Sequence, residues 1–298
     1  MTAVADALPD YFTFTYPRRS SDFCLCALRP PRALFGVSDM IGHPEGLRWR
    51  NYMRVLARDL RRLIEGDAGA GLAELQARLT GHLLWHDQQI FEFRQRHDRA
   101  AFGFCVLFVF LEGVAGRLHW LGDCRAYRIT RSPRDPADGS RRFRVRCLTR
   151  DHNALAALVE DRGEITLFRD EMIEQAKRLN AFLGLGVEEH NRELLTRATP
   201  IEPLTTDDCL LLMTDGLYVP HLRASLDGLN FHLNHERLYL ESWLARLLEE
   251  ADRRIPDDEP NYWSELATIL VEETLKLVRH RRHYRDDMAL TGIYVPES

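Results

Sequence analysis

The sequence of 298 residues lacks several features that would assign it to a class at once. Its most apolar run, residues 102–111, is far shorter than the roughly 20 residues that a membrane-spanning helix needs. We therefore expect a buried strand there and no membrane segment. The opening residues, MTAVADALPDYF, have neither the basic flank nor the apolar core of a signal peptide, so a cytoplasmic location is expected.

A basic excess and a CxxC pair of cysteines are also missing. The formal net charge is −5, which gives the chain no electrostatic footprint for nucleic acid. The six cysteines are scattered and no CxxC pair occurs, so we expect reduced thiols and neither a zinc site nor disulfides. Neither an internal repeat nor a flexible linker is visible. What is present, with 45% hydrophobic residues, is the composition of a globular protein with ample core.

The order of apolar patterns predicts the fold class. Strands are expected at 11–16, 23–28, 33–38, within 101–148, at 205–218 and at 288–295, and helices from 46 onward, over 72–96, within 151–183, over 238–253 and over 264–278. Parallel βαβ alternation is not apparent, which argues against a doubly wound fold. We predict an α+β fold, a four-layer α-β-β-α sandwich with two antiparallel β-sheets. One domain over 1–298 is expected, because candidate acidic residues lie in both halves of the chain.

Aspartates recur where apolar runs end. The stretch LFGVSDMIGHPEG, residues 34–46, places Asp39 at the end of a strand and before a turn. Asp123, Asp215 and Asp286 follow the same pattern. Carboxylates at the ends of separate strands can meet in one cleft, and such a cluster repels itself unless cations neutralise it. Taken singly, each of these residues is equally well interpreted as a turn or cap aspartate.

Six segments carry further motifs, in a fixed order along the chain. They read GVSDMIGH, WLGDCRAYRI, LTRDHNALAALVEDRGEIT, NRELLTRA, LTTDDCLLLMTDGLY and RDDMALTGIYV. Together they resemble the metal-dependent Ser/Thr protein phosphatases of type 2C, also called PPM, over about residues 17–295, in the form of a bacterial-type stand-alone member. The resemblance implies a flap subdomain at about 151–200. It also implies hydrolysis of phosphoserine or phosphothreonine in a phosphorylated protein by a metal-bridging hydroxide, and a signalling role opposed by a Ser/Thr protein kinase.

The resemblance also implies a metal site. Asp39 would bridge two ions, Asp215 and Asp286 would hold one of them, and the backbone carbonyl of Met40 would face the other. Asp151 matches the acidic residue that holds a third, weaker ion. Ligands that are all oxygen atoms suit Mg²⁺ or Mn²⁺.

Two further roles follow from the resemblance. Asp22 matches the N-terminal acid that orients metal-bound water. Arg18 or Arg19 is expected to bind the phosphate as a fork, because a guanidinium group matches a phosphate with two parallel hydrogen bonds. Asp123 is expected to be mostly structural, supporting the loops of the site, and Asp287 to point away from it.

The chain departs from the family pattern at four positions. Met40 and His43 stand where the family has glycine, Ser21 replaces one of two N-terminal acids, and Ile41 stands where some members have histidine. A side chain at position 40 requires a negative φ. These departures keep an alternative open, a catalytically weak pseudophosphatase that acts as a phosphoprotein-binding or regulatory module. A regulatory phosphatase for a signalling partner, such as an anti-sigma-factor antagonist, is a further alternative.

Overall fold

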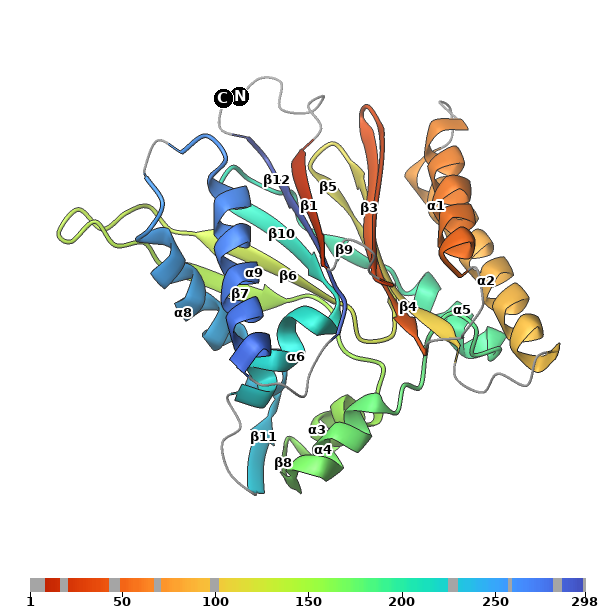
Figure 1. Cartoon of the computed structure of the whole chain (residues 1–298). Helices are drawn as coiled ribbons and strands as arrows, with labels where there is room; N and C mark the ends of the chain where they lie inside the picture. Colours follow the sequence, from red (N-terminus) through yellow and green to blue (C-terminus); the bar gives the residue numbers. More distant parts are fainter. Residues whose placement is uncertain are drawn as a thin grey trace.

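The computed structural model describes residues 9–16, 21–42, 49–66, 71–96, 102–224, 230–256, 259–280 and 286–296. Within these ranges the chain forms twelve strands and nine helices. Two five-stranded sheets lie face to face, and helices cover the outer face of each (Figure 1). The predicted α+β sandwich with two antiparallel sheets is therefore confirmed.

The first sheet has the strand order β1-β12-β10-β6-β7, and every neighbouring pair is antiparallel. Its strands are β1 (Asp10–Tyr16), β12 (Met288–Tyr294), β10 (Asp208–Met213), β6 (Arg125–Arg131) and β7 (Phe143–Cys147). Three helices cover its outer face, α6 (Asp215–Ala224), α8 (Glu241–Asp252) and α9 (Tyr262–His280) (Figure 1). Strands from both halves of the chain are thus neighbours in one sheet.

The second sheet has the order β2-β3-β4-β5-β9, again antiparallel throughout. Its strands are β2 (Phe23–Arg29), β3 (Arg32–Ile41), β4 (Gly103–Glu112), β5 (Ala115–Leu121) and β9 (Thr199–Ile201). The helices α1 (Trp49–Gly66), α2 (Leu72–Arg96) and α5 (Glu188–Thr196) lie on its outer side (Figure 1). Leu56 and Leu60 of α1 are buried against this sheet while Arg54 and Arg61 face solvent, as an amphipathic helix requires.

Alternation along the strands decides which residues lie between the sheets. In β3, Ala33, Phe35 and Val37 belong to the inter-sheet core, whereas Leu34 and Met40 pack against the helices. Successive side chains of a strand point to opposite faces, so Asp39 continues the inter-sheet row. The strand also continues beyond Asp39 to Ile41, whereas the sequence had predicted that it ends at the aspartate, because β4 pairs with it through Ile41.

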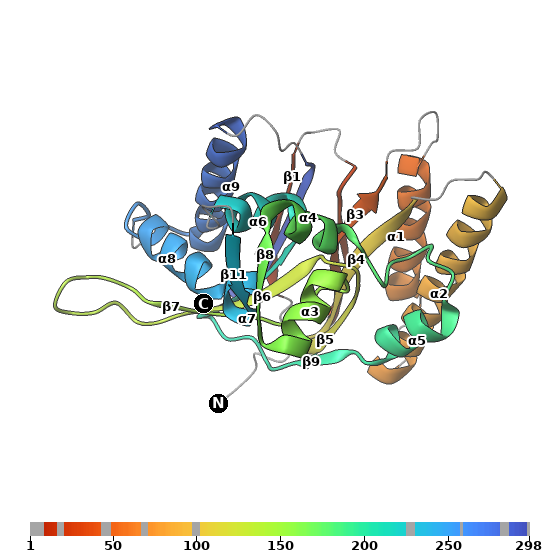
Figure 2. The same ribbon diagram turned by 90° about the horizontal axis from the view of Figure 1, so that it is seen from below.

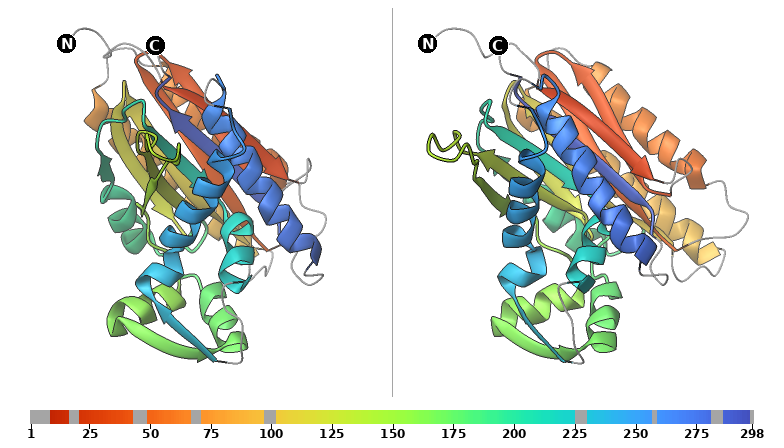
Figure 3. Two further views of the ribbon diagram at one scale, coloured as in Figure 1. Left: turned by 90° about the vertical axis from the view of Figure 1, so that its left-hand side faces the viewer. Right: turned by 60° about the vertical axis from the view of Figure 1, so that its left-hand side comes forward.

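A smaller unit extends from one end of the sandwich (Figures 2 and 3). It comprises α3 (Ala154–Arg162), β8 (Glu164–Phe168), α4 (Arg169–Lys177), β11 (Asn230–Asn234) and α7 (His235–Tyr239). The strands β8 and β11 form a two-stranded antiparallel sheet. The sequence predicted helical and irregular structure from residue 151 and no strand at 164–168 or 230–234, so this sheet is new information. The strand predicted at 205–218 is also shorter than expected, because α6 begins at Asp215.

A close approach between two segments positions the open end of the first sheet. Thr214 and Ala289 exchange hydrogen bonds, from Thr214 N to Ala289 O over 3.1 Å and from Ala289 N to Thr214 Oγ1 over 2.9 Å. Next to them, a Cβ on Gly216 would overlap the carbonyl oxygen of Asp287. Only glycine at 216 therefore allows the residues after β10 to lie against those before β12.

We expect Gly216→Ala to lower the free energy of unfolding by about 1–3 kcal/mol, because the backbone of one segment must shift to accept the methyl group. Gly81→Ala is the matched control, since nothing lies within 4 Å of a Cβ added there on α2. It should raise stability by about 0.5–1 kcal/mol. Urea denaturation of both variants measures this, and a Gly216→Ala protein as stable as the wild type would contradict the close approach.

Candidate active site

Carboxylates from distant segments meet at one end of the inter-sheet core. Asp22 precedes β2 and Asp39 lies near the end of β3, while Asp123 follows β5. Asp215 comes directly after β10, and Asp286 comes just before β12. The negative charges of neighbouring members raise the pKa values of Asp22, Asp39 and Asp215, so the five residues lie within electrostatic reach of one another. The structure thus brings together the predicted site residues Asp22, Asp39, Asp215 and Asp286, and Asp151 lines the same cleft as the last three.

Burial is the main electrostatic feature of this cluster. It is the largest cause that raises the pKa of Asp39 well above its ordinary value, and the charge of Asp22 adds to the effect. Burial likewise raises the pKa of Asp215, with Asp39 and Asp286 contributing. The carboxyl groups of Asp22 and Asp39 are close enough that each affects the pKa of the other. Such a cluster is stabilised by positive charge, whether protons or metal ions.

Asp123 belongs to the carboxylate cluster itself, whereas the sequence suggested only a supporting role. Burial, and then the charge of Asp151, raise the pKa of the Asp123 carboxyl to about 6. Donor atoms of Asp39, Cys105 and Asp123 lie within 4.8 Å of one another, a grouping that can hold a cation. Sequence reasoning gave Asp123 a supporting role and Cys105 none, because nothing in the spacing of these residues along the chain indicates that they meet.

The donor set fits divalent cations. Oδ1 of Asp123 and Oδ1 of Asp215 are buried and have no hydrogen-bond partner among the described residues. A buried carboxylate oxygen without a donor is costly, and a cation relieves that cost. Aspartate oxygens are the ligands that Mg²⁺ and Mn²⁺ prefer. Asp39, Asp123, Asp215 and Asp286 therefore supply the type of oxygen atom that such ions require.

Met40 has the negative φ that a side chain at this position requires. Among the described residues other than glycine, Leu240 is the single one with a positive φ, so Met40 has an ordinary negative value. Its side chain is buried on the helix side of the sheet, away from Asp39. Phe104, its partner on β4, uses its N–H and C=O on Leu183 instead. In an antiparallel pair, the carbonyl of Met40 then also points away from β4. Its role as a metal ligand stays a prediction.

Ser21 and Asp287 form a clasp beside the cluster. Both the backbone N–H and the hydroxyl of Ser21 donate to Oδ2 of Asp287. The sequence predicted only that Asp287 points away from the site, whereas here it ties the segment before β2 to the segment before β12. A carboxylate at position 21, as in the family pattern, would repel Asp287. Serine therefore suits this chain at the position where the expected acid is missing.

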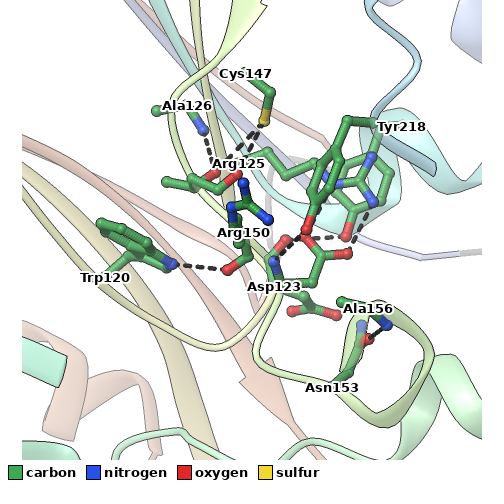
Figure 4. A network of polar contacts seen from close by, with 12 residues as sticks. Trp120, Asp123, Arg125, Ala126, Cys147, Arg150, Asn153, Ala156 and Tyr218 are labelled. Carbon is green, nitrogen blue, oxygen red and sulfur yellow. Dashed lines mark hydrogen bonds and ion pairs between the residues drawn. The ribbon is translucent and has the colours of Figure 1, made fainter. Parts of the chain in front are cut away.

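Asp151 forms an ion pair with the buried Arg125, which Figure 4 shows beside Asp123 and Tyr218. Arg125 Nε and Nη2 donate to its two carboxylate oxygens over 3.0 and 2.8 Å, and the Arg125 side chain is 1% exposed. The guanidinium lies 3.6 Å from the ring centre of Tyr218, whose hydroxyl donates to the carbonyl oxygen of Asp123 over 2.9 Å. Asp151 thus supports the loop that carries Asp123, and its role with a third metal stays a prediction.

The cluster opens into a cleft of about 330 Å³. Its acidic lining consists of Asp39, Asp123, Asp151, Asp215 and Asp286. The opposite wall is apolar and comes mainly from the smaller unit and α6, through Leu155, Met172, Ile173, Leu179, Val219, Leu222 and Leu238. Lys177 and Arg223 also line the cleft. Arg18 and Arg19, the predicted phosphate ligands, lie outside the described residues.

Comparisons with known proteins agree with this architecture. No protein-family model and no curated protein matches the sequence. Solved structures do match in fold. A serine/threonine phosphatase from S. agalactiae is 16% identical with a TM-score of 0.62, and the alignment covers 96% of this chain and 99% of that one. Stp1 from Staphylococcus aureus is 15% identical with a TM-score of 0.61, and the alignment covers 100% of this chain and 98% of Stp1.

PppA from Pseudomonas aeruginosa, described as a key regulatory component of T6SS, is 14% identical with a TM-score of 0.59. That alignment covers 97% of this chain and 98% of PppA. The chain therefore has the fold of the PPM-type Ser/Thr phosphatases over nearly its whole length.

Replacing Arg125 by methionine should cost about 3–5 kcal/mol of stability, because Asp151 keeps a buried charge without its cation. The double variant Arg125→Met/Asp151→Leu should recover part of this loss, since both charges are then absent. Arg142→Met, which removes an exposed pair with Glu249, should cost less than about 1 kcal/mol. Chemical denaturation of the three proteins checks the series. A double variant as unstable as Arg125→Met would refute the pairing argument.

Proposed function

We propose that this protein is a metal-dependent protein phosphatase that hydrolyses phosphoserine or phosphothreonine in a partner protein. One observation carries the proposal. Asp39, Asp215 and Asp286 come from strand ends far apart in the sequence, and they line one cleft at the open end of a PPM-type sandwich. Placing several carboxylates together away from water destabilises the folded state. Metal ions bound between them would offset this destabilisation and give the cluster a function.

The chain's own residues have separable roles in this proposal. Asp39, Asp215 and Asp286 hold Mg²⁺ or Mn²⁺, and Asp22 holds a proton or water beside Asp39. When bound, two such cations neutralise phosphoryl oxygens and lower the pKa of water, which makes a nucleophile available at neutral pH. The apolar wall of the cleft contacts the substrate next to its phosphorylated residue and excludes bulk water from it.

The surroundings of the cleft suit a protein substrate. Lys177 and Arg223 place positive charge along it, where it favours a phosphorylated, acidic segment. We propose that the unit of α3, β8, α4 and β11 is the flap of a single phosphatase domain, and that a Ser/Thr kinase supplies the substrate. In the described part of the chain, no helix has the length and apolarity to span a bilayer. A cytoplasmic signalling role is part of the proposal.

The second candidate is a pseudophosphatase that binds a phosphoprotein without hydrolysing it. The contact between Ser21 and Asp287 favours this candidate, because the second N-terminal acid of the family pattern is absent and its place is taken by a structural clasp. Asp39, Asp215 and Asp286, all present in the cleft, favour the enzyme.

The decisive assay is hydrolysis of p-nitrophenyl phosphate with Mn²⁺ and with EDTA. We expect turnover that depends on Mn²⁺ in the wild type and loses at least about a thousandfold in Asp39→Asn and Asp215→Asn, because each variant removes a central ligand. Without metal, both variants should melt at or above the wild-type temperature, since one repelling charge is gone. Mn²⁺ binding by calorimetry without turnover in the wild type would instead support the pseudophosphatase.

The phosphate-binding arginine can be found from steady-state kinetics. If Arg18 or Arg19 clamps the phosphate, its alanine variant should raise KM for a phosphopeptide about tenfold or more and change kcat little, because the contact exists before the chemical step. Lys177→Ala tests the basic residue that lines the cleft. Arg144→Ala, exposed on β7 and outside the cleft lining, is the control. An unchanged KM in all of the first three variants would exclude them as phosphate ligands.

A further inference from the structure

A cysteine lies directly beneath the proposed metal site. Cys105 on β4 is the cross-strand partner of Asp39 on β3. Both residues follow the rows that face the other sheet, so their side chains share one face, where direct partners have Cβ atoms about 5 Å apart. The sulfur of Cys105 is one of three donor atoms, with carboxylate oxygens of Asp39 and Asp123, that lie within 4.8 Å of one another.

The loop after β5 is shaped around this sulfur. Gly122 has a φ of 99°, a conformation that L residues rarely adopt, and a Cβ on it would overlap Sγ of Cys105. The glycine therefore lets the backbone lie against the thiol and carry Asp123 to it. A carboxylate oxygen of Asp123 then lies within 4.8 Å of this sulfur. Contact between Cys105 and Asp123 is thus a built feature of the fold.

The spacing of the three donor atoms allows a cation to bind between them, and their charge favours its binding. Oδ1 of Asp123 is buried without a hydrogen-bond partner among the described residues. Cys105 is 0% exposed and does not line the cleft, whereas Asp39 and Asp123 do. A cation that enters between the two carboxylates from the cleft would meet the sulfur behind them.

We propose that Cys105 contributes its sulfur to a cation held by Asp39 and Asp123, so that this part of the site prefers thiophilic divalent ions over Mg²⁺. The inference rests on the metal site of the proposed function and names the class of ion that this site selects. On binding, the thiol S–H bond breaks, the sulfur–metal bond forms and the proton leaves to solvent. Thiolate ligands favour softer ions such as Co²⁺, Zn²⁺ and Cd²⁺, whereas Mg²⁺ strongly prefers oxygen.

The test uses Co²⁺ and Cd²⁺ on the full chain after metal removal by EDTA. Co²⁺ should give a near-ultraviolet thiolate-to-metal absorption band in the wild type, and Cys105→Ser should abolish it. By calorimetry, Cys105→Ser should weaken Cd²⁺ binding about 10- to 100-fold and change Mg²⁺ binding less than about threefold. Cys209→Ser is the matched control. Cys209 is equally buried but lies at the opposite end of β10 from Asp215, so the band should persist.

The outcomes separate this inference from the proposed function. A band that persists in Cys105→Ser, or no band in the wild type, overturns the role of the sulfur. Mn²⁺-dependent turnover without the band leaves the phosphatase standing and removes this inference. The absorption band without turnover keeps the role of the sulfur and contradicts the phosphatase activity. If Cys105→Ser fails to fold by circular dichroism, the cadmium NMR shift of the wild type decides, because sulfur ligation and all-oxygen ligation give well-separated shifts.

Discussion

Repulsion among carboxylates buried between two sheets is the constraint on which the site depends. Burial raises the pKa of Asp22, Asp39, Asp123 and Asp215, and the charges of neighbouring carboxylates raise it further. The fully buried cation nearby, Arg125, is committed to both oxygens of Asp151. Much of its charge is therefore engaged with Asp151, although it also lowers the pKa of the neighbouring Asp123. A cation bound in the cleft would relieve the remaining repulsion among these carboxylates.

The surrounding sandwich supplies the rigidity that such a cluster needs. Ala33, Phe35 and Val37 on β3 pack between the sheets in the same row as Asp39, so the carboxylate cannot turn away without disrupting the core. On the other sheet, hydrogen bonds between Thr214 and Ala289 hold the ends of β10 and β12 together. The clasp between Ser21 and Asp287 links the segment before β2 of the second sheet to the segment before β12 of the first sheet. Strand pairing thus fixes the positions of the carboxylates more firmly than loops alone would.

The fold and the acidic residues could be predicted because local patterns carry them. Alternation and apolar runs predict the strands, and the ordered motifs around Asp39, Asp215 and Asp286 predict the cleft. The rest depends on long-range contacts. Cys105 meets Asp123 only because β3, β4 and β5 pair in one register, and no local signal marks that meeting. The pairing of β8 with β11 joins polar, partly exposed segments, so hydrophobic patterning gave no sign of it.

The order of strands in the first sheet has a consequence for how the protein is made. β12 is the last strand along the chain, yet it lies between β1 and β10 and brings Asp286 into the cleft. On a ribosome, residues near position 22 and position 39 emerge long before those near 286. The nascent chain must therefore wait with an open gap in this sheet, and the exposed strand edges on either side of the gap are liable to pair with other chains. This sheet is therefore complete only once β12 has been made and has paired on both of its edges.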